Sequence, residues 1–277
     1  VPNDINGKYF YIKEGDTVWN PGWKPTQTEL DSYECRHGIG YSRFTGAKNG
    51  LSASVLTFVP MDDNCEISQV TLTNLSDDVK TASLFSYVEW CLWNADDDSR
   101  NFQRNLNTGE VEVVGSTIYH KTEYRERRNH YAVYSVNTPV DGFDTSRDAF
   151  LGAYRSASNP EAVEKGQASN SMANGWSPIA SHQINVTLLP KESKTFIFVL
   201  GYVENPEDQK WEAPGIINKK PAEELLAKYR TDADVEQAFC TLNAYWNKLL
   251  SNYTVKSSND KVDRMVNIWN QYQCMVT

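Results

Sequence analysis

The residues best suited to chemistry lie in a polar run between Asp96 and Asn105. Three consecutive aspartates open the run, and Asn101 and Arg104 follow them. Asn and Arg side chains hold hydrogen-bond donors at fixed angles, which can match the neighbouring hydroxyls of a sugar. The alternative is a solvated acidic turn whose carboxylates pair with arginines. The residue types therefore indicate either a sugar-binding loop or a charged turn.

A second candidate is the turn-rich loop of residues 16–25, which carries Trp19 and Trp23. Aromatic faces pack well against the C–H face of a pyranose ring. Because Pro21 and Gly22 separate the two tryptophans, the loop could line a sugar subsite, form an interface, or simply pack on the protein. These three interpretations stay open at this point.

The stretch from Lys121 to His130 carries four basic and two acidic side chains. Such a cluster of cations could bind phosphate. Glu123 and Glu126 nevertheless offer enough partners to favour a salt-bridge network at a surface or interface. We therefore interpret this stretch as structural.

Several other chemistries are disfavoured. No Ser or Cys stands in a nucleophile elbow, and the four histidines lack the spacing of metal ligands, so a hydrolytic triad or a zinc site is not expected. A glycosidase pair such as Asp98 with Glu110 depends on a separation in space that the sequence does not give. The four histidines are His37, His120, His130 and His182.

The composition indicates which partners and which cellular compartment to expect. The net charge of −9 repels phosphate backbones and anionic lipids, so we expect neither nucleic acid nor membrane as a partner. The five cysteines are scattered, without a C-x-x-C pair, which favours a reducing, cytoplasmic compartment. The first residues also lack the features of a signal peptide.

The elements that must position these residues are mostly strands. From residue 8 to about residue 203, short β-prone runs alternate with turn residues. Residues 182–189 and 194–201 flank a Pro190–Ser193 turn and are predicted to form a hairpin. Residues 84–93 are apolar at nearly every position, as in a strand covered on both faces. This pattern predicts two large antiparallel sheets packed face to face.

The periodicity changes to that of helices after Gly215. We expect one helix from Pro221, a second from about Asp232 to Leu250, and a third that begins near Asn259. The third helix carries an apolar face to Thr277 without a stop signal. An apolar face needs a partner surface, so a further helical domain is expected, and the chain looks cut at both ends.

Seven strings, in collinear order over almost the whole chain, resemble the N-terminal portion of the cellobiose phosphorylases of glycoside hydrolase family 94. They are GDTVWNPGW (15–23), YECRHGIGY (33–41), EWCLWN (89–94), NFQRN (101–105), YHKTEYRERR (119–128), DGFDT (141–145) and DRMVNIWNQYQCMVT (263–277). The resemblance implies a mainly β fold. A large antiparallel β-super-sandwich would occupy residues 1–215, with its N-terminal edge missing. Linker α-helices would follow over 216–250, and 251–277 would begin a truncated catalytic (α/α)₆ barrel.

The resemblance also implies a carbohydrate-metabolising glycosyltransferase reaction. Family members reversibly convert cellobiose and inorganic phosphate, a co-substrate and not a cofactor, into α-glucose 1-phosphate and glucose with inversion. An aspartate in the barrel, beyond Thr277, would be the general acid, so no catalytic residue is assigned to this piece. Since phosphate is itself an anion, the reaction needs no protein general base.

The resemblance further implies a homodimer in which the sandwich of one subunit reaches the acceptor-sugar site of the other. Asn101 and Arg104 resemble the residues of that contact, which makes them the candidate substrate-binding pair. The piece alone would then be inactive. The alternative is a non-catalytic carbohydrate-binding or dimerisation module, and a self-contained glycosidase is a third, less favoured interpretation.

Overall fold

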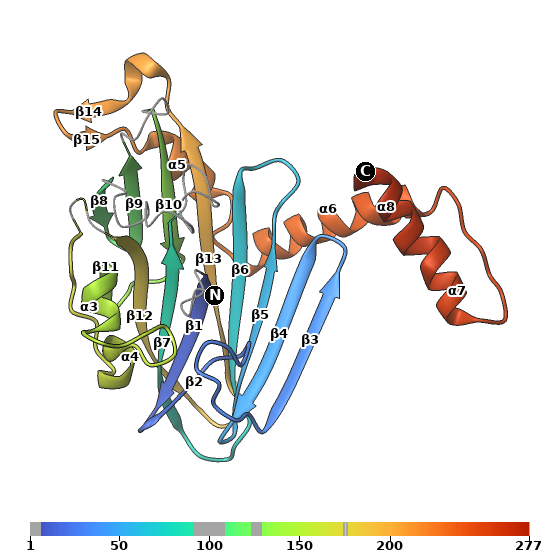
Figure 1. Cartoon of the computed structure of the whole chain (residues 1–277), viewed down its shortest axis with the longest axis horizontal. Coiled ribbons are helices and arrows are strands. Elements are labelled where there is room, and N and C mark those ends of the chain that lie inside the picture. Colours follow the sequence, from blue (N-terminus) through green and yellow to red (C-terminus); the bar gives the residue numbers. More distant parts are fainter. Residues whose placement is uncertain (1–6, 91–108, 123–128, 174, 176, 277) are drawn as a thin grey trace.

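The computed structural model describes residues 7–90, 109–122, 129–173, 175 and 177–276. Two antiparallel sheets pack face to face, and helices cover the outer side of the larger sheet (Figure 1). The mainly β super-sandwich followed by helices is therefore confirmed.

The smaller sheet has five strands and the larger has eight. The smaller runs in the order β11 (Gly142–Ser146), β12 (Pro178–Leu188), β7 (Lys80–Glu89), β1 (Lys8–Glu14) and β2 (Thr17–Trp19). The larger runs in the order β3 (Ser32–Gly38), β4 (Tyr41–Lys48), β5 (Leu51–Phe58), β6 (Cys65–Asn74), β13 (Ser193–Glu204), β10 (His130–Val136), β9 (Thr117–Thr122) and β8 (Gly109–Val114).

The remaining elements are short, apart from two helices near the end of the chain. They are α3 (Arg147–Leu151), α4 (Glu161–Lys165), η1 (Glu207–Gln209), the paired strands β14 (Trp211–Ala213) and β15 (Ile216–Ile217), α5 (Lys220–Ala227), α6 (Asp232–Leu250), α7 (Asp260–Arg264), the π-helix η2 (Met265–Asn270) and α8 (Gln271–Val276). Among the helices in the described ranges, none is long and apolar enough to span a membrane.

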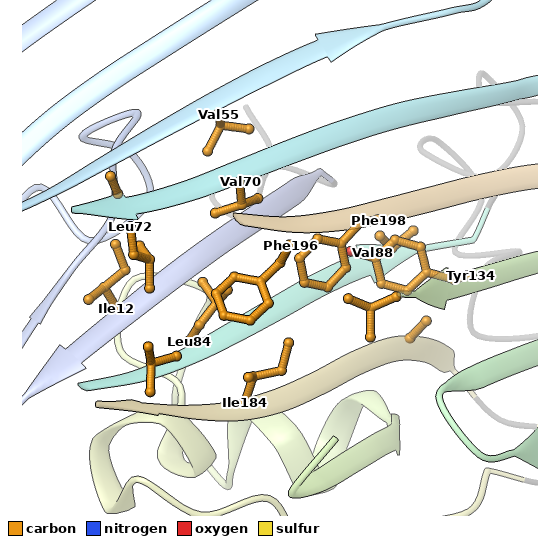
Figure 2. Packing of buried hydrophobic residues seen from close by; sticks show 14 of the residues in the cluster. Ile12, Val55, Val70, Leu72, Leu84, Val88, Tyr134, Ile184, Phe196 and Phe198 are labelled. Atoms are coloured by element: carbon orange, nitrogen blue, oxygen red, sulfur yellow. The ribbon is translucent and has the colours of Figure 1, made fainter. Parts of the chain in front are cut away.

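The inner layer is the apolar core between the two sheets (Figure 2). Alternate residues of each strand point into it, because side chains of a strand project to opposite faces. Val70 and Phe198 enter from the larger sheet and Leu84 and Ile184 from the smaller one. The apolar residues that alternate along each strand thus meet in one continuous core.

Strand β7 is buried on both faces, as predicted. Leu84 and Val88 face the inner layer, whereas Phe85 and Tyr87 pack on the opposite face in a cluster with Phe150 of α3. The prediction covered residues 84–93, and its last three residues lie outside the described part of the chain.

The predicted hairpin of residues 182–201 is wrong, although both strands exist. β12 pairs with β7 and β11 in the smaller sheet, while β13 pairs with β6 and β10 in the larger sheet. The chain therefore crosses between sheets, and Nδ2 of Asn74 donates to the Leu188 and Leu189 carbonyls at the crossing. Both connections place alternate apolar residues in one core, so the alternation could not distinguish them.

The outer layer is the apolar cluster between the larger sheet and helices α5 and α6. Val235 and Leu242 are the buried residues of α6 and face this layer. The bounds of α6 match the prediction. The hydroxyl of Thr231 accepts a hydrogen bond from the Asp234 amide, and the Asp234 carboxylate accepts one from the Thr231 amide, which forms a capping box.

Candidate functional site

The predicted substrate-binding residues Asn101 and Arg104 lie outside the described residues, as do Asp96, Asp97 and Asp98. The structure does describe the two anchors of this segment, the end of β7 before it and β8 after it. The candidate site can therefore be built from the groups that hold its two ends.

The first anchor is an aromatic stack across the two sheets. Trp90, at the end of β7, lies over His120 of β9 with ring centroids 5.4 Å apart and an interplanar angle of 17°. His120 is fully buried, and neither ring nitrogen has a hydrogen-bond partner among the described residues. Burial, with a smaller contribution from the charge of His130, lowers the pKa of His120 to about 3. The ring is therefore neutral at pH 7 and packs as an aromatic.

A carboxylate on the opposite face of the smaller sheet ties the end of β7 to helix α3. Glu89 accepts a 2.5 Å hydrogen bond from the Tyr87 hydroxyl and a 3.0 Å hydrogen bond from Nε of Arg147. Both partners of the Arg147–Glu89 ion pair are largely buried, so the contact is held more rigidly than a surface pair. It joins the end of β7 to the start of α3.

The second anchor is an ionic cluster on β8 and β9. Nζ of Lys121 lies 2.8 Å from Glu112 and 2.9 Å from Glu110, and Lys219 forms a second ion pair with Glu112. Burial opposes the charge of Lys121, but its hydrogen bonds to Glu112 and Glu110 outweigh burial and raise its pKa. Glu112 also accepts a hydrogen bond from the Ile217 amide. The cluster thus connects the sandwich to the segment that leads into α5.

This cluster only partly matches the sequence interpretation of residues 121–130. A structural salt-bridge network is present at Lys121, but its partners are Glu110 and Glu112, while Glu123 and Glu126 lie outside the described residues. The sequence itself contains a pattern that predicts the pairing of Lys121 with Glu110. A short turn at Gly115 joins two strand-like runs, which places Glu110 directly opposite Lys121.

The two tryptophans of the loop of residues 16–25 differ in their exposure to solvent. Trp19 is fully buried in the inner layer, while the side chain of Trp23 is 43% exposed. The packed interpretation is therefore correct for Trp19. Asn20, Pro21 and Gly22, between the two tryptophans, line a cavity together with residues of β1, β4, β5 and β6.

Across the ranges that the structure describes, no three His, Cys, Asp or Glu residues are placed to hold a metal ion. The described cysteines, Cys35, Cys65, Cys240 and Cys274, are free thiols.

The sequence matches two family models. Residues 1–232 match the model described as Glycosyl hydrolase 94, supersandwich domain, and residues 245–277 match the Glycosyl hydrolase 94 superfamily, catalytic domain. The predicted domain boundaries at residues 215 and 250 stay predictions.

Several curated relatives are named as sugar phosphorylases. The chain is 33% identical over 278 residues to N,N'-diacetylchitobiose phosphorylase of Vibrio proteolyticus, covering 98% of this chain and 32% of the relative. It is 29% identical to solabiose phosphorylase of Paenibacillus borealis, covering 97% of this chain and 34% of the relative. The chain therefore spans about a third of the length of these relatives.

A solved structure supports the fold. A putative kojibiose phosphorylase from human microbiome superposes with a TM-score of 0.53 at 11% sequence identity, over 86% of this chain and 27% of that chain. At this identity the likeness concerns the fold alone. Together with the match over residues 1–232, it leads to one assignment: the chain belongs to glycosyl hydrolase family 94, of which it carries the supersandwich domain and a stretch matching the catalytic domain.

Proposed function

We propose that this chain is the supersandwich portion of an inverting disaccharide phosphorylase that acts on cellobiose. The observation that carries the proposal is the match of residues 1–232 to the family's supersandwich domain, followed in order by a match to its catalytic domain. The relatives above are named for other disaccharides, so the choice of cellobiose rests on the sequence strings that resemble cellobiose phosphorylases.

In the proposed reaction, phosphate attacks the anomeric carbon of the non-reducing glucose while an acid protonates the departing oxygen. The C–O bond breaks as the new C–O–P link forms on the opposite face, which gives α-glucose 1-phosphate and glucose. We expect the acid in the catalytic domain, outside these 277 residues. The sandwich would contribute Asn101 and Arg104 to the acceptor glucose of the partner in a cytoplasmic homodimer.

The first experiment supplies the full-length protein with phosphate and each of two disaccharides. Glucose 1-phosphate released from cellobiose, with no comparable product from N,N'-diacetylchitobiose, would support the proposal. N-acetylglucosamine 1-phosphate from chitobiose instead would reject the choice of cellobiose and retain phosphorolysis. Sugar release without phosphate would contradict phosphorolysis itself.

The second experiment tests the acceptor role and the dimer together. Arg104→Ala should raise the KM for glucose in the synthetic direction more than the KM for glucose 1-phosphate, and Arg100→Ala is the matched control from the same segment. Mixing Arg104→Ala subunits with subunits inactivated in the catalytic domain should restore activity. If the loop of one subunit completes the active site of the other, each mixed dimer contains one site with an intact loop and an intact barrel, so activity returns. If each loop serves its own subunit, the mixed dimer contains no such site and activity does not return.

A further inference from the structure

Strand β3 forms one edge of the larger sheet, beside β4 (Figure 1). All seven of its residues are at least partly exposed. Because side chains alternate along a strand, Tyr33, Cys35 and His37 share one face of β3. This face presents a thiol and an imidazole, two groups that neither the anchors nor the proposed reaction uses.

The thiol and the imidazole are in direct contact. Sγ of Cys35 lies 3.1 Å from Nε2 of His37, and Nδ1 of His37 lies 2.8 Å from Oγ of Ser42. The register places Ser42 directly opposite His37 and Phe44 directly opposite Cys35. The His37 ring also packs edge-on against Phe44, with ring centroids 5.8 Å apart. A hydroxyl and an aromatic ring thus hold the imidazole with its Nε2 at the sulfur.

This arrangement contains the three parts of an activated nucleophile. A thiol reacts as its thiolate, so a base within hydrogen-bond reach that accepts the thiol proton speeds the reaction. Nε2 of His37 can accept this proton in the tautomer whose Nδ1 carries a proton and donates it to Ser42. The contacts therefore join a nucleophile, a base and a group that orients the base.

The hydroxyl of Tyr33 is a second polar group beside the sulfur. Burial raises the pKa of Tyr33, and the charge of Cys35 and a hydrogen bond with Cys35 raise it further. The hydroxyl therefore keeps its proton at neutral pH and donates it to the sulfur. A donor in this position favours the negative charge of a thiolate.

The surroundings of the pair favour reaction at the sulfur over metal binding. In the described ranges, no third His, Cys, Asp or Glu residue is placed to hold a metal ion with Cys35 and His37. Ser42 and Phe44 also line the cavity of about 350 Å³ beside the loop after β2, so open volume adjoins the pair. By contrast, burial raises the pKa of Cys65 to about 12, which keeps that thiol protonated.

We propose that Cys35 is a site of thiol–disulfide exchange with low-molecular-weight disulfides. His37 accepts the thiol proton, the Cys35 sulfur attacks one sulfur of the disulfide, and the S–S bond of the reagent breaks as the new S–S bond forms. The departing thiolate then takes the proton from His37. Cys35 is thereby oxidised to a mixed disulfide, and the other half of the reagent is reduced to a thiol. The site rests on these contacts alone and is independent of phosphorolysis.

The test treats the 277-residue chain at pH 7 with bis(2-hydroxyethyl) disulfide, a neutral reagent, and follows each cysteine separately by peptide mass spectrometry. Cys240, an exposed free thiol of α6, is the internal control. Since Cys35 is the less exposed of the two, accessibility alone predicts that Cys240 reacts faster. We expect the opposite order, with Cys35 reacting about fivefold faster. A rate at Cys35 that does not exceed the rate at Cys240 would overturn the proposal.

A matched pair of variants on β3 tests the base. His37→Gln keeps a polar group near the sulfur but cannot accept the proton, so the rate at Cys35 should fall about fivefold. Arg36→Gln, on the opposite face of β3, removes a charge that pairs with Glu34 and should leave this rate unchanged. The rate at Cys240 should be the same in all three proteins. An unchanged rate at Cys35 in His37→Gln would reject the role of His37.

Ser42 is a positioning residue, and two variants separate its effect on the imidazole from a loss of packing. Ser42→Ala removes the partner of Nδ1, so the rate at Cys35 should fall about threefold, as expected for one lost hydrogen bond. Ser42→Thr keeps the hydroxyl and should retain the wild-type rate. Equal rates in Ser42→Ala and Ser42→Thr would reject the orienting role of this hydroxyl.

Discussion

The two faces of the eight-stranded sheet are stabilised in different ways. The inner layer joins two sheets through aromatic and aliphatic side chains, and it encloses the neutral histidines His120 and His182. The outer layer joins the sheet to two helices, and ion pairs at its margin reinforce it, such as Lys228 with Asp63 and Lys219 with Glu112. The inner layer should therefore set the global stability, while the outer layer sets how firmly the helices are held.

The largest expected effect is loss of packing in the inner layer. Phe198 is 1% exposed and contacts the rings of Phe10 and Tyr134. Phe198→Ala should lower the free energy of unfolding by about 4 kcal/mol, from lost transfer energy and the cavity it leaves. Urea denaturation followed by circular dichroism measures this change.

Two leucines of equal size compare the layers directly, Leu84 of the inner layer, which is 0% exposed, and Leu242 of α6, which is 4% exposed. Leu84→Ala should cost about 4 kcal/mol and Leu242→Ala about 2 kcal/mol, because a helix on the surface relaxes around the smaller residue more readily than two packed sheets do. Equal costs for the two variants would show that the layers contribute alike.

Breaking the ionic cluster of the outer layer should have the next largest effect. Glu112→Gln leaves Lys121 and Lys219, which are 5% and 10% exposed, with a neutral partner. The expected cost is about 3 kcal/mol, typical of a buried charge that loses its counter-ion. Glu110→Gln is the control, because Glu110 pairs with the same lysine but its side chain is 68% exposed. This variant should cost less than about 1 kcal/mol. A similar cost for both variants would contradict a buried pair.

The two layers should also respond to different pH ranges. Burial lowers the pKa of both His120 and His182 to about 3 from 6.5. Below pH 6.5 the unfolded chain binds protons that the folded chain does not, so stability falls as the pH falls towards 3. The slope is about 1.4 kcal/mol per pH unit for each histidine. Burial opposes ionisation of Glu112, but hydrogen bonds from Lys121 and Lys219 lower its pKa below 4.5, so its contribution is lost only at more acidic pH.

Substitution of one histidine can isolate the inner layer between pH 6.5 and pH 5. His120→Phe keeps the stack on Trp90 and removes the titrating group. The variant should show about half of the wild-type loss of stability between these pH values, as measured by urea denaturation at each pH. An unchanged slope would mean that other groups govern this range.

The comparison of the layers also explains what the sequence could predict. A continuous apolar run located β7, alternation located β12 and β13, and the 3.6-residue period gave the bounds of α6. The partner of each strand was not predictable, because β12 and β13 both alternate although they belong to different sheets. Which strands pair depends on contacts between distant parts of the chain, and the local alternation does not encode this choice.

The candidate sites also differ in how far the sequence could predict them. Residue types at Asn101 and Arg104 suggested sugar binding, and that assignment stays a prediction because both lie outside the described residues. The carboxylate partners of Lys121 follow from a local hairpin and could have been found. The cavity beside Asn20 could not, because β1, the loop after β2 and strands β4, β5 and β6 line it together and come from both sheets.

The smallest predicted effect concerns the helix caps and tests whether α6 belongs to the stabilised structure. Thr231→Ala removes the hydroxyl that accepts a hydrogen bond from the Asp234 amide, beside the buried Val235. It should cost about 1 kcal/mol in urea denaturation. Asn259→Ala removes the same kind of cap from α7, whose residues are not buried. A cap stabilises the folded protein only if its helix unfolds with the rest, so Asn259→Ala should leave the global transition unchanged. Equal shifts would instead mean that α7 unfolds cooperatively with the sandwich.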